Sequence, residues 1–537
     1  MTRFGENSKT TGIKDGLVVR TYYKSAHVVG TIKVPVNALD KMTDTEHSKI
    51  TVMQRTIAPV TSSRLFQSTK SASKPTSTFK DIPLSNEAHA RQPASLKASG
   101  AALATDKSGK AIDIISLSTG RPHPRYYPFE SVDFAFTTVN SSSSGNEPSA
   151  KTFGKTRTAR YDIAEQNAAI DLSVALSYGY SAGSEQLIKF LTEHIEAVHD
   201  PPYSDWNCAL TVGSTSALDL AIRTLSEPGD GVLVEEYTYS GMIECLKPLN
   251  RKIVAVPKNQ GGLCPDALDT LLMHWDTTLP KPRLLYTIPT GQNPTGITQN
   301  MERRRQIYKV AEKHNLLVLE DDPYGYLRFT EDKLPSYLSL DTSGRVLRFD
   351  STSKTLSPGL RCAWMTGQTN LIQRFLHLHD VSIVSPSGVS QLMMYKLLGE
   401  VWGHEGFSSW LRYLRAQYRD RMLIMAKACE TYLPEHLCSW DLPEAGMFFW
   451  LKIHWDEHAI ARSSEKDISN IILAIENQLY NTALEQGVLC CKGSFFNARD
   501  VQSDLYVRLT FVTASKSEIV EAIQRFARSL ELVFDQS

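Results

Sequence analysis

Short apolar segments alternate with helix-like segments from about residue 111 of this 537-residue chain. Strand-like segments lie at 208–212, 231–236, 252–256, 283–288, 316–322 and 345–350, and helix-like segments such as 214–225, 265–275 and 301–315 lie between them. Strands that are apolar on both sides suit a parallel sheet, because the crossover helices cover both of its faces. The chain is therefore predicted to fold as an α/β protein around a mostly parallel sheet flanked by helices.

The pattern changes after about residue 380. A long charged helix is expected over 406–432, followed by a strand at 446–453, a helix at 468–486, a strand at 505–512 and a final helix from 515. This order predicts a second, smaller α+β domain. We expect an extension over 1–80, an N-terminal arm with part of the small domain over 81–175, a large domain over 176–385, and linking helices with the C-terminal small domain over 386–537.

The first 80 residues are rich in Ser, Thr and Lys and show no helical or strand period. The stretch from Met53 to Lys80 has five basic residues and no acidic one. This composition is typical of a disordered extension or of a mitochondrial leader. We expect a cytoplasmic protein with a disordered extension; the alternative is a mitochondrial form made from an internal start at Met53.

The charge balance excludes a general attraction to nucleic acids or anionic membranes, since Lys plus Arg and Asp plus Glu are 58 each. No apolar run has the length that a membrane span requires. The eight cysteines are scattered, without the paired spacing of metal ligands or of a disulfide framework. We therefore expect no metal site, no membrane or nucleic-acid partner, and a reducing compartment.

Polar residues that could bind a ligand or take part in catalysis lie at the ends of the predicted strands. Ser214 and Thr215 open the helix after 208–212, Asn293 follows 283–288, Asp321 lies near the end of 316–322, and Lys354 follows 345–350. In open parallel sheets, ligands bind beyond the carboxyl ends of the strands. Each of these motifs alone is weak, but together they predict one binding site at this edge of the sheet.

These residue types suit pyridoxal phosphate. An aldehyde cofactor needs a lysine for a Schiff base, and its pyridine nitrogen needs a carboxylate that holds the ring proton. Its phosphate needs hydroxyl groups, a helix N-terminus and an arginine. Lys354, Asp321 and Arg361, with the Ser and Thr residues around them, provide these groups.

Four motifs resemble those of fold-type I, class I/II aminotransferases: "NPTG" at 293–296, "EDDPYGYLRF" at 320–329, "STSKTLSPGLR" at 351–361 and "YVRLTF" at 506–511. From about residue 81 onward the chain is similar to the branch that holds fungal aromatic-amino-acid, kynurenine and 2-aminoadipate aminotransferases. The resemblance implies that Lys354 carries the Schiff base and that Asp321 pairs with the pyridinium nitrogen. It also implies that Asn293 and Tyr324 bond the phenolic oxygen.

The resemblance implies further cofactor and substrate residues. For the cofactor it implies Ser214, Thr215, Ser351, Ser353 and Arg361 at the phosphate, Tyr239 on the ring, and Tyr178 reaching the phosphate of a neighbouring subunit, hence a homodimer. For the substrate it implies Arg508 on the α-carboxylate, with Asn293, Gly120, Arg121 and Phe448 near it. Arg121 could meet the distal carboxylate of glutamate or 2-oxoglutarate and swing away from an aromatic side chain. Alternatively, Arg121 caps the turn or pairs with a nearby acid in solvent. Gly120 could instead serve only to form a turn, and Phe448 could be an ordinary core residue.

The expected function is transfer of an amino group from an aromatic amino acid to 2-oxoglutarate, or to another 2-oxo acid, by a ping-pong mechanism. Kynurenine and 2-aminoadipate are alternative donors. Elimination or cyclopropane formation on the same scaffold is a second alternative. A transcription regulator is a third, but it requires a helix-turn-helix before the enzyme-like region, and residues 1–80 lack the necessary apolar period.

Overall fold

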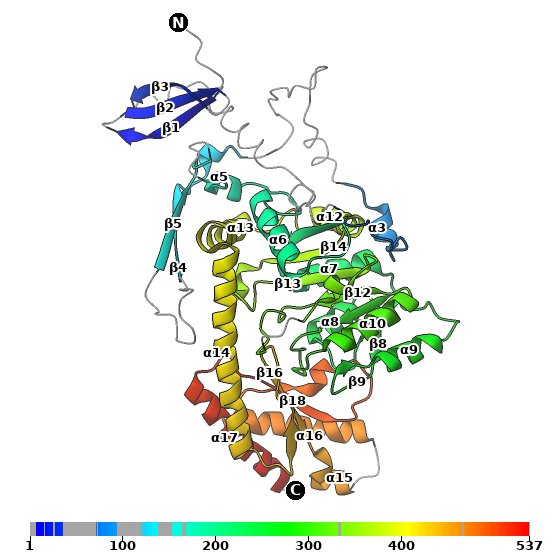
Figure 1. The fold of residues 1–537 in the computed structure, drawn as a ribbon. Coiled ribbons are helices and arrows are strands. Elements are labelled where there is room, and N and C mark those ends of the chain that lie inside the picture. Colours follow the sequence, from blue (N-terminus) through cyan, green and yellow to red (C-terminus); the bar gives the residue numbers. More distant parts are fainter. Residues whose placement is uncertain are drawn as a thin grey trace.

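The computed structural model describes most of the chain (Figure 1). The described residues are 7–14, 17–24, 27–35, 71, 73–93, 120, 122–137, 153–163, 168–330, 334–463 and 467–535. Arg121 lies outside them, as do residues 53–70 of the leader-like stretch. Within the described part, no helix is both long enough and apolar enough to cross a membrane.

A seven-stranded sheet forms the centre of the large domain, and the predicted strand series is confirmed. Its order is β6-β14-β13-β12-β11-β7-β8, and six of its strands share one direction. The bounds are β6 (Trp206–Thr211), β7 (Gly231–Glu235), β8 (Lys252–Val256), β11 (Leu284–Thr287), β12 (Leu317–Asp321), β13 (Val346–Ser351) and β14 (Ala363–Gln368).

The antiparallel strand β14 was not expected from the sequence. It pairs with β13 on one side and with β6 on the other, with Ala363 opposite both Ser351 and Thr211. The segment before it contains Pro358 and Gly359, which indicate a turn, and its own six residues are all buried, so no alternation marks it as a strand. Because β14 runs back against β13, the connection between them begins and ends at the same edge of the sheet.

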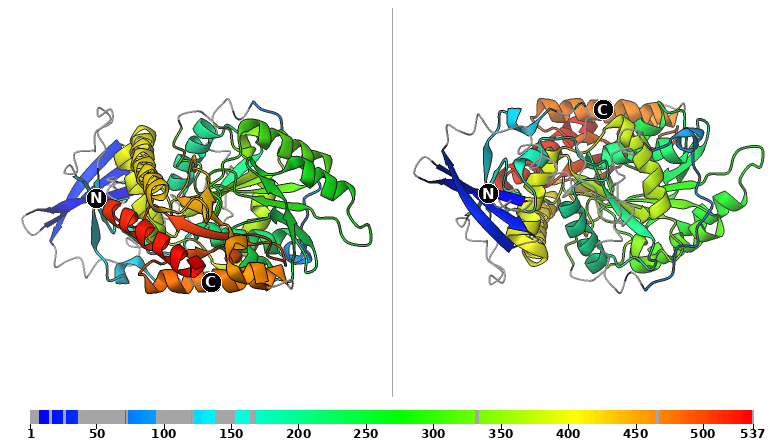
Figure 2. Two further views of the ribbon diagram at one scale, coloured as in Figure 1. Left: turned by 90° about the horizontal axis from the view of Figure 1, so that it is seen from below. Right: turned by 90° about the horizontal axis from the view of Figure 1, so that it is seen from above.

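Helices cover both faces of this sheet (Figure 1, Figure 2), and a layer of apolar side chains lies beneath the helices on each face. Alternate residues of one strand enter different layers, as Val318 and Leu319 of β12 show. One layer packs against α6 (Glu185–Val198), α9 (Pro265–Met273) and α10 (Met301–Lys313), and the other against α7 (Gly213–Leu225), α8 (Ser240–Leu246) and α12 (Thr369–Ser382). Each fully buried aliphatic side chain contributes about 1.5–3 kcal/mol to folding.

The C-terminal part forms a second domain around a four-stranded antiparallel sheet of order β15-β16-β18-β17. The helix α14 runs from the large domain down to it in Figure 1, and α16 and α17 pack on its sheet. The bounds are α13 (Gly388–Tyr395), a π-helical turn (Lys396–Trp402), α14 (Gly403–Tyr432), β15 (Cys438–Trp440), β16 (Phe448–Ile453), α15 (Ala459–Ser463), α16 (Ile468–Glu485), β17 (Cys491–Lys492), β18 (Leu505–Thr510) and α17 (Lys516–Asp535).

Residues at the end of the expected extension, shortly before residue 81, contact the large domain. Phe79 is buried and its N–H donates to Ser343 O at 2.7 Å, while Ser77 Oγ donates to Asp205 Oδ2 at 2.6 Å. A few anchoring residues of this kind carry no periodic signal, so the composition of the segment does not reveal them. Backbone strands β1 (Asn7–Lys14), β2 (Leu17–Lys24) and β3 (His27–Pro35) also form a sheet within the expected extension.

The remaining N-terminal elements lie between this segment and α6. They are α3 (Asn86–Ala90), a hairpin of β4 (Ser131–Thr137) and β5 (Phe153–Ala159), and the short helix α5 (Leu172–Ala175). Asp171 caps α5 by accepting a hydrogen bond from Val174 N at 3.0 Å.

Candidate active site

The carboxyl edge of the large sheet brings four of the predicted segments together. Asp321 is the last residue of β12, Ser351 is the last residue of β13, and α7 begins at Gly213, two residues after β6. Asn293 lies in the loop that follows β11. Because these strands are parallel, their polar ends face the same side of the molecule.

Asp321 is buried beside a tyrosine that the sequence did not indicate. The hydroxyl of Tyr286 donates to Asp321 Oδ2 at 2.7 Å, and Oδ1 is buried without a hydrogen-bond partner among the described residues. Burial raises the pKa of Asp321 to about 7; the Tyr286 bond opposes this rise, and the nearby carboxylates Asp322 and Asp350 add to it. A carboxylate with one such oxygen fits a protonated ring nitrogen, which would pair with it.

This burial predicts a pH dependence for the cofactor-free protein. Folded Asp321 keeps a proton up to about pH 7, whereas the unfolded chain releases it near 3.8. The folded state therefore binds more protons between these values, and the free energy of unfolding should fall as pH rises, by a few kcal/mol in order of magnitude. Denaturant titrations of the cofactor-free protein at several pH values in this range should show a smaller fall of the unfolding free energy in Asp321→Asn than in wild type.

A second buried carboxyl provides a matched control for this titration. Burial raises the pKa of Asp171 to about 6, and this residue caps α5, which is not part of the sheet edge. Asp171→Asn should remove only the contribution of Asp171, which lies between about pH 4 and 6, and should leave the fall between pH 6 and 7 unchanged. Identical curves for wild type and Asp321→Asn would contradict the raised pKa.

The start of α7 and the loop before β14 form a cradle for an anion. Gly213 has a φ of +79°, and a Cβ atom there would collide with the guanidinium of Arg361. Arg361 Nη1 lies 3.5 Å from Ser353 Oγ, and the buried Ser214 Oγ has no hydrogen-bond partner among the described residues. Helix N–H groups, hydroxyls and an arginine fit a phosphate group.

Lys354 lies half-buried between the cradle and the small domain. Burial lowers the pKa of its amine, and the positive charges of Arg508 and Arg361 lower it further. A lowered pKa increases the fraction of neutral amine, which is the form that attacks an aldehyde or accepts a proton.

Arg508 lies on β18 between two aromatic rings. Its guanidinium carbon is 4.4 Å from the ring centroid of Phe448 and 4.6 Å from that of Phe496. Its Nη1 donates to Asn293 Oδ1 at 2.7 Å, which leaves the Asn293 amide nitrogen as a donor. Phe448 also packs edge-on against Tyr324, with ring centroids 5.8 Å apart. The small domain thus provides an arginine and an apolar wall to the strand ends.

Tyr239 is half-buried at the start of α8, close enough to Tyr286, Tyr324 and Arg508 to interact electrostatically with each of them. Thr215 is exposed on the first turn of α7, at the anion cradle. Two other predicted residues are not brought into the cluster in the single chain. Tyr178 is 64% exposed. Gly120 is exposed as well, and no described atom lies within 4 Å of the place where its Cβ would be.

Two residues of the site were not predicted from the sequence, Tyr286 and Phe496. Tyr286 could have been found, because on β11 it pairs with Leu319, which is on the same face of β12 as Asp321. Phe496 follows the short strand β17 in a 3₁₀ turn (Gly493–Phe496), and no periodic pattern marks it.

Comparison with known proteins agrees with this geometry. Residues 147–526 match the family model for aminotransferase class I and II. The chain is 41% identical to the aminotransferase SwnA of Metarhizium robertsii, over 79% of this chain and 87% of that one. It is 38% identical to an aromatic amino acid aminotransferase of Schizosaccharomyces pombe, over 83% and 97% of the two chains. The crystal structure of aminotransferase Aro8 from Candida albicans superposes with a TM-score of 0.77 at 33% identity, covering 86% of this chain and all of that one.

The matched region contains the lysine, the buried carboxylate, the anion cradle and the arginine. A carboxylate oxygen and a serine hydroxyl that are buried without partners fit a cofactor with a ring nitrogen and a phosphate. The chain belongs to the class I and II aminotransferases, enzymes that depend on pyridoxal phosphate.

Proposed function

We propose that this aminotransferase takes the amino group from an aromatic amino acid and passes it to 2-oxoglutarate, or to another 2-oxo acid, in a ping-pong reaction. The observation that carries the proposal is the position of Arg508 between Phe448 and Phe496. An α-carboxylate bound to this arginine has its side chain beside aromatic rings, which favour another aromatic ring. The Schizosaccharomyces pombe relative is named for aromatic amino acids, which supports the same substrate class.

Bound pyridoxal phosphate supplies an aldehyde and a ring that withdraws electrons from the substrate Cα. The amine of Lys354 would hold the aldehyde of the cofactor, and as a neutral amine it would take the proton from the substrate Cα. Asp321 holds the proton on the ring nitrogen, and Asn293 and Tyr324 donate to the phenolic oxygen. Further residues that hold the cofactor are Ser214, Thr215, Ser351, Ser353 and Arg361 at the phosphate and Tyr239 on the ring.

An amino-donor panel tests the proposed substrate class. With 2-oxoglutarate as acceptor, phenylalanine, tyrosine and tryptophan should give higher kcat/KM values than alanine or aspartate. Formation of glutamate reports transfer, and ammonia release without an acceptor would report elimination instead. Kynurenine and 2-aminoadipate belong in the panel, because a preference for either would overturn the assignment to common aromatic amino acids.

Arg508→Lys should lower kcat/KM for every donor in this panel. Lysine keeps the positive charge but loses the two-pronged contact with the α-carboxylate that all donors share. We expect a loss of about 10-fold to 100-fold, as for a charge-assisted hydrogen bond of about 1.5–3 kcal/mol. A loss confined to aromatic donors would show that Arg508 acts on the side chain instead.

We also propose a homodimer with active sites at the subunit interface. Tyr178 and Gly120 are exposed in the single chain, as expected for residues that meet a second copy. A monomeric mass by sedimentation would contradict this.

We propose a cytoplasmic location; the alternative is import into mitochondria of a form that starts at Met53. The role of Arg121 stays a prediction, whether it binds the substrate or caps the turn.

A further inference from the structure

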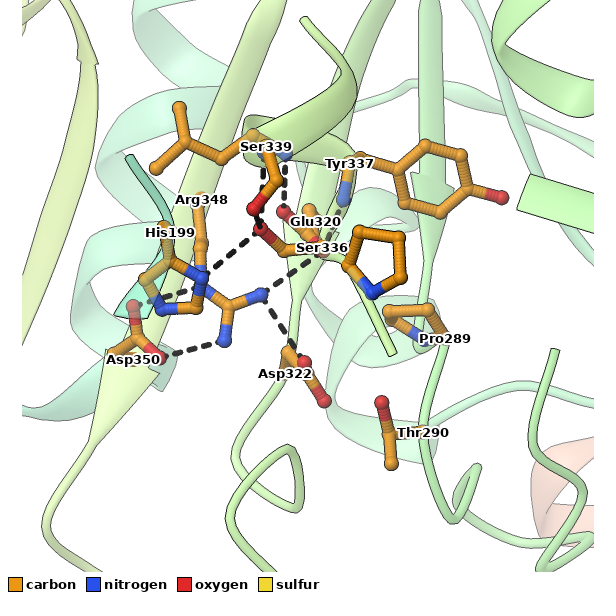
Figure 3. A network of polar contacts seen from close by, with 12 residues as sticks. His199, Pro289, Thr290, Glu320, Asp322, Ser336, Tyr337, Ser339, Arg348 and Asp350 are labelled. Atoms are coloured by element: carbon orange, nitrogen blue, oxygen red, sulfur yellow. Dashed lines mark hydrogen bonds and ion pairs between the residues drawn. The ribbon is translucent and has the colours of Figure 1, made fainter. Parts of the chain in front are cut away.

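Arg348 is buried at the centre of a cluster of carboxylates behind the active site (Figure 3). Its Nε and Nη2 donate to the two oxygens of Asp350 at 2.9 Å and 2.8 Å. Its Nη1 lies 2.9 Å from Glu320 Oε1 and 3.1 Å from Asp322 Oδ2. One guanidinium therefore binds three carboxylates from two neighbouring strands and the turn after one of them.

The cluster and the active site lie on opposite faces of the same two strands. Glu320 pairs with Arg348 in the parallel register of β12 and β13, and Asp321 pairs with Phe349. Because side chains alternate along a strand, Glu320 and Asp322 point away from Asp321 and toward the face with α6 and α10. This orientation separates the roles of the adjacent acids, since Asp322 binds Arg348 while Asp321 binds Tyr286.

Two carboxylates of the cluster lie at the start of loops of the active site, and the third caps the short helix α11 (Tyr337–Leu340). Asp322 opens the turn that carries Tyr324, and Asp350 lies four residues before Lys354. Glu320 accepts hydrogen bonds from the N–H groups of Tyr337 and Leu338 at 2.8 Å and 3.1 Å. A bidentate guanidinium contact restricts both distance and angle, so Arg348 sets how the ends of β12 and β13 lie relative to each other.

The charges of the cluster are not balanced by Arg348 alone. Burial raises the pKa of both Glu320 and Asp350, which favours the protonated form of these two acids. A cavity of about 70 Å³ adjoins Arg348, Asp322 and His199. Asp322 Oδ1 and His199 Nε2 are buried there without partners among the described residues, while His199 Nδ1 lies 3.0 Å from Ser336 Oγ. This space is polar and large enough for water.

We propose that Arg348 is a positioning residue for the transamination reaction: by binding Asp322 and Asp350 together, it fixes the spacing between the loops that carry Tyr324 and Lys354. This inference rests on the roles proposed above for those two residues. Arg348 touches neither cofactor nor substrate, so its loss changes the geometry of a bound cofactor and leaves the binding groups in place.

Arg348→Lys tests the proposal, with Arg345→Lys as the matched control. Lysine keeps the charge but cannot bind Asp350 with two donors and also reach Asp322. Arg345 is a buried arginine directly before the same strand; its Nε donates to Ser343 Oγ at 2.9 Å and its Nη1 to Leu316 O at 3.0 Å. Both variants should lose thermal stability. A loss of activity that appears only in Arg348→Lys therefore reports positioning, because the loss of stability is common to both.

The expected difference is in turnover and in the cofactor's optical signal. Arg348→Lys should lower kcat at least about 10-fold with KM within about twofold, since misplacing reacting groups lowers the rate more than the binding. It should also reduce the visible circular dichroism of bound pyridoxal phosphate, whereas Arg345→Lys should keep both close to wild type. Equal kcat values and equal dichroism in the two variants would overturn the proposal.

A second variant decides the question if Arg348→Lys does not fold. Asp350→Asn has the same shape and removes a buried charge, so it should fold, yet it weakens one half of the bidentate contact. It should lower kcat about threefold to 10-fold and weaken the dichroism; wild-type values for both would overturn the proposal. The dichroism needs no amino donor, so it tests Arg348 even if the proposed aromatic substrate is wrong.

Discussion

Replacement of Lys354 by alanine is expected to lower transamination by about 10⁴-fold, the upper end of what a positioned proton-transfer group contributes. The variant loses both the amine that anchors the aldehyde and the group that moves the Cα proton. Binding of the phosphate should persist, because Gly213, Ser214 and Arg361 remain in place. Borohydride reduction followed by peptide mass spectrometry should find the cofactor attached to residue 354 in wild type only.

Lys258 provides the matched control for this experiment. Burial also lowers the pKa of Lys258, but its ammonium lies over the rings of Tyr237 and Tyr506 rather than at the sheet edge. Lys258→Ala should keep the adduct at Lys354 and most of the activity. An adduct recovered at another lysine of the wild-type enzyme would refute the assignment of Lys354.

Asp321→Asn is expected to keep the cofactor bound but to lower kcat by about 10²-fold to 10³-fold, as for loss of one preorganised electrostatic contact. A neutral amide cannot hold a proton on the ring nitrogen, so the ring withdraws electrons less effectively. The change alters Asp321 Oδ1 and the bond from Tyr286 without changing the shape of the side chain. Steady-state rates with phenylalanine and single-turnover absorbance changes measure the effect.

Asp171→Asn serves as the control for removing a buried carboxylate. Burial raises the pKa of the Asp171 carboxyl in the wild type as well. The Asp171→Asn variant should have a lower free energy of unfolding without a comparable loss of turnover. Near-normal turnover in Asp321→Asn would mean that another group holds the ring proton. Asp322 is a poor candidate for that role, because its carboxylate binds Arg348 on the opposite face of the sheet.

The large sheet was predictable because its parallel strands are short apolar runs, most of them followed by a helix. The site followed from the same pattern, since Asn293, Asp321 and Lys354 lie at or shortly after the carboxyl ends of strands, and these ends must meet. The choice between Asp321 and Asp322 was harder. It depends on which face each residue takes at the end of β12, and a shift of one residue in the strand would exchange them.

Other parts of the molecule depend on contacts that a linear pattern does not express. The strand β14 is buried on both faces and follows a turn, so its antiparallel direction becomes visible only through its pairing with β13 and β6. In the sequence, Arg348 is a charged residue within an apolar strand, and nothing there indicates that it is buried. It is fully buried because three acids from neighbouring segments surround it. Phe496 reaches Arg508 through a short turn of the small domain.

The antiparallel course of β14 has a consequence for how this enzyme can vary in sequence length. Residues 352–362 join two hydrogen-bonded neighbours, with Ser351 opposite Ala363, so the span between Lys354 and Arg361 is closed at both ends. An insertion there cannot be absorbed by a displaced crossover helix and would separate the aldehyde-binding amine from the phosphate-binding guanidinium. Libraries that scan insertions through the gene should therefore lose function throughout 352–362, while the exposed connection near Asp276 and Thr278 should accept added residues.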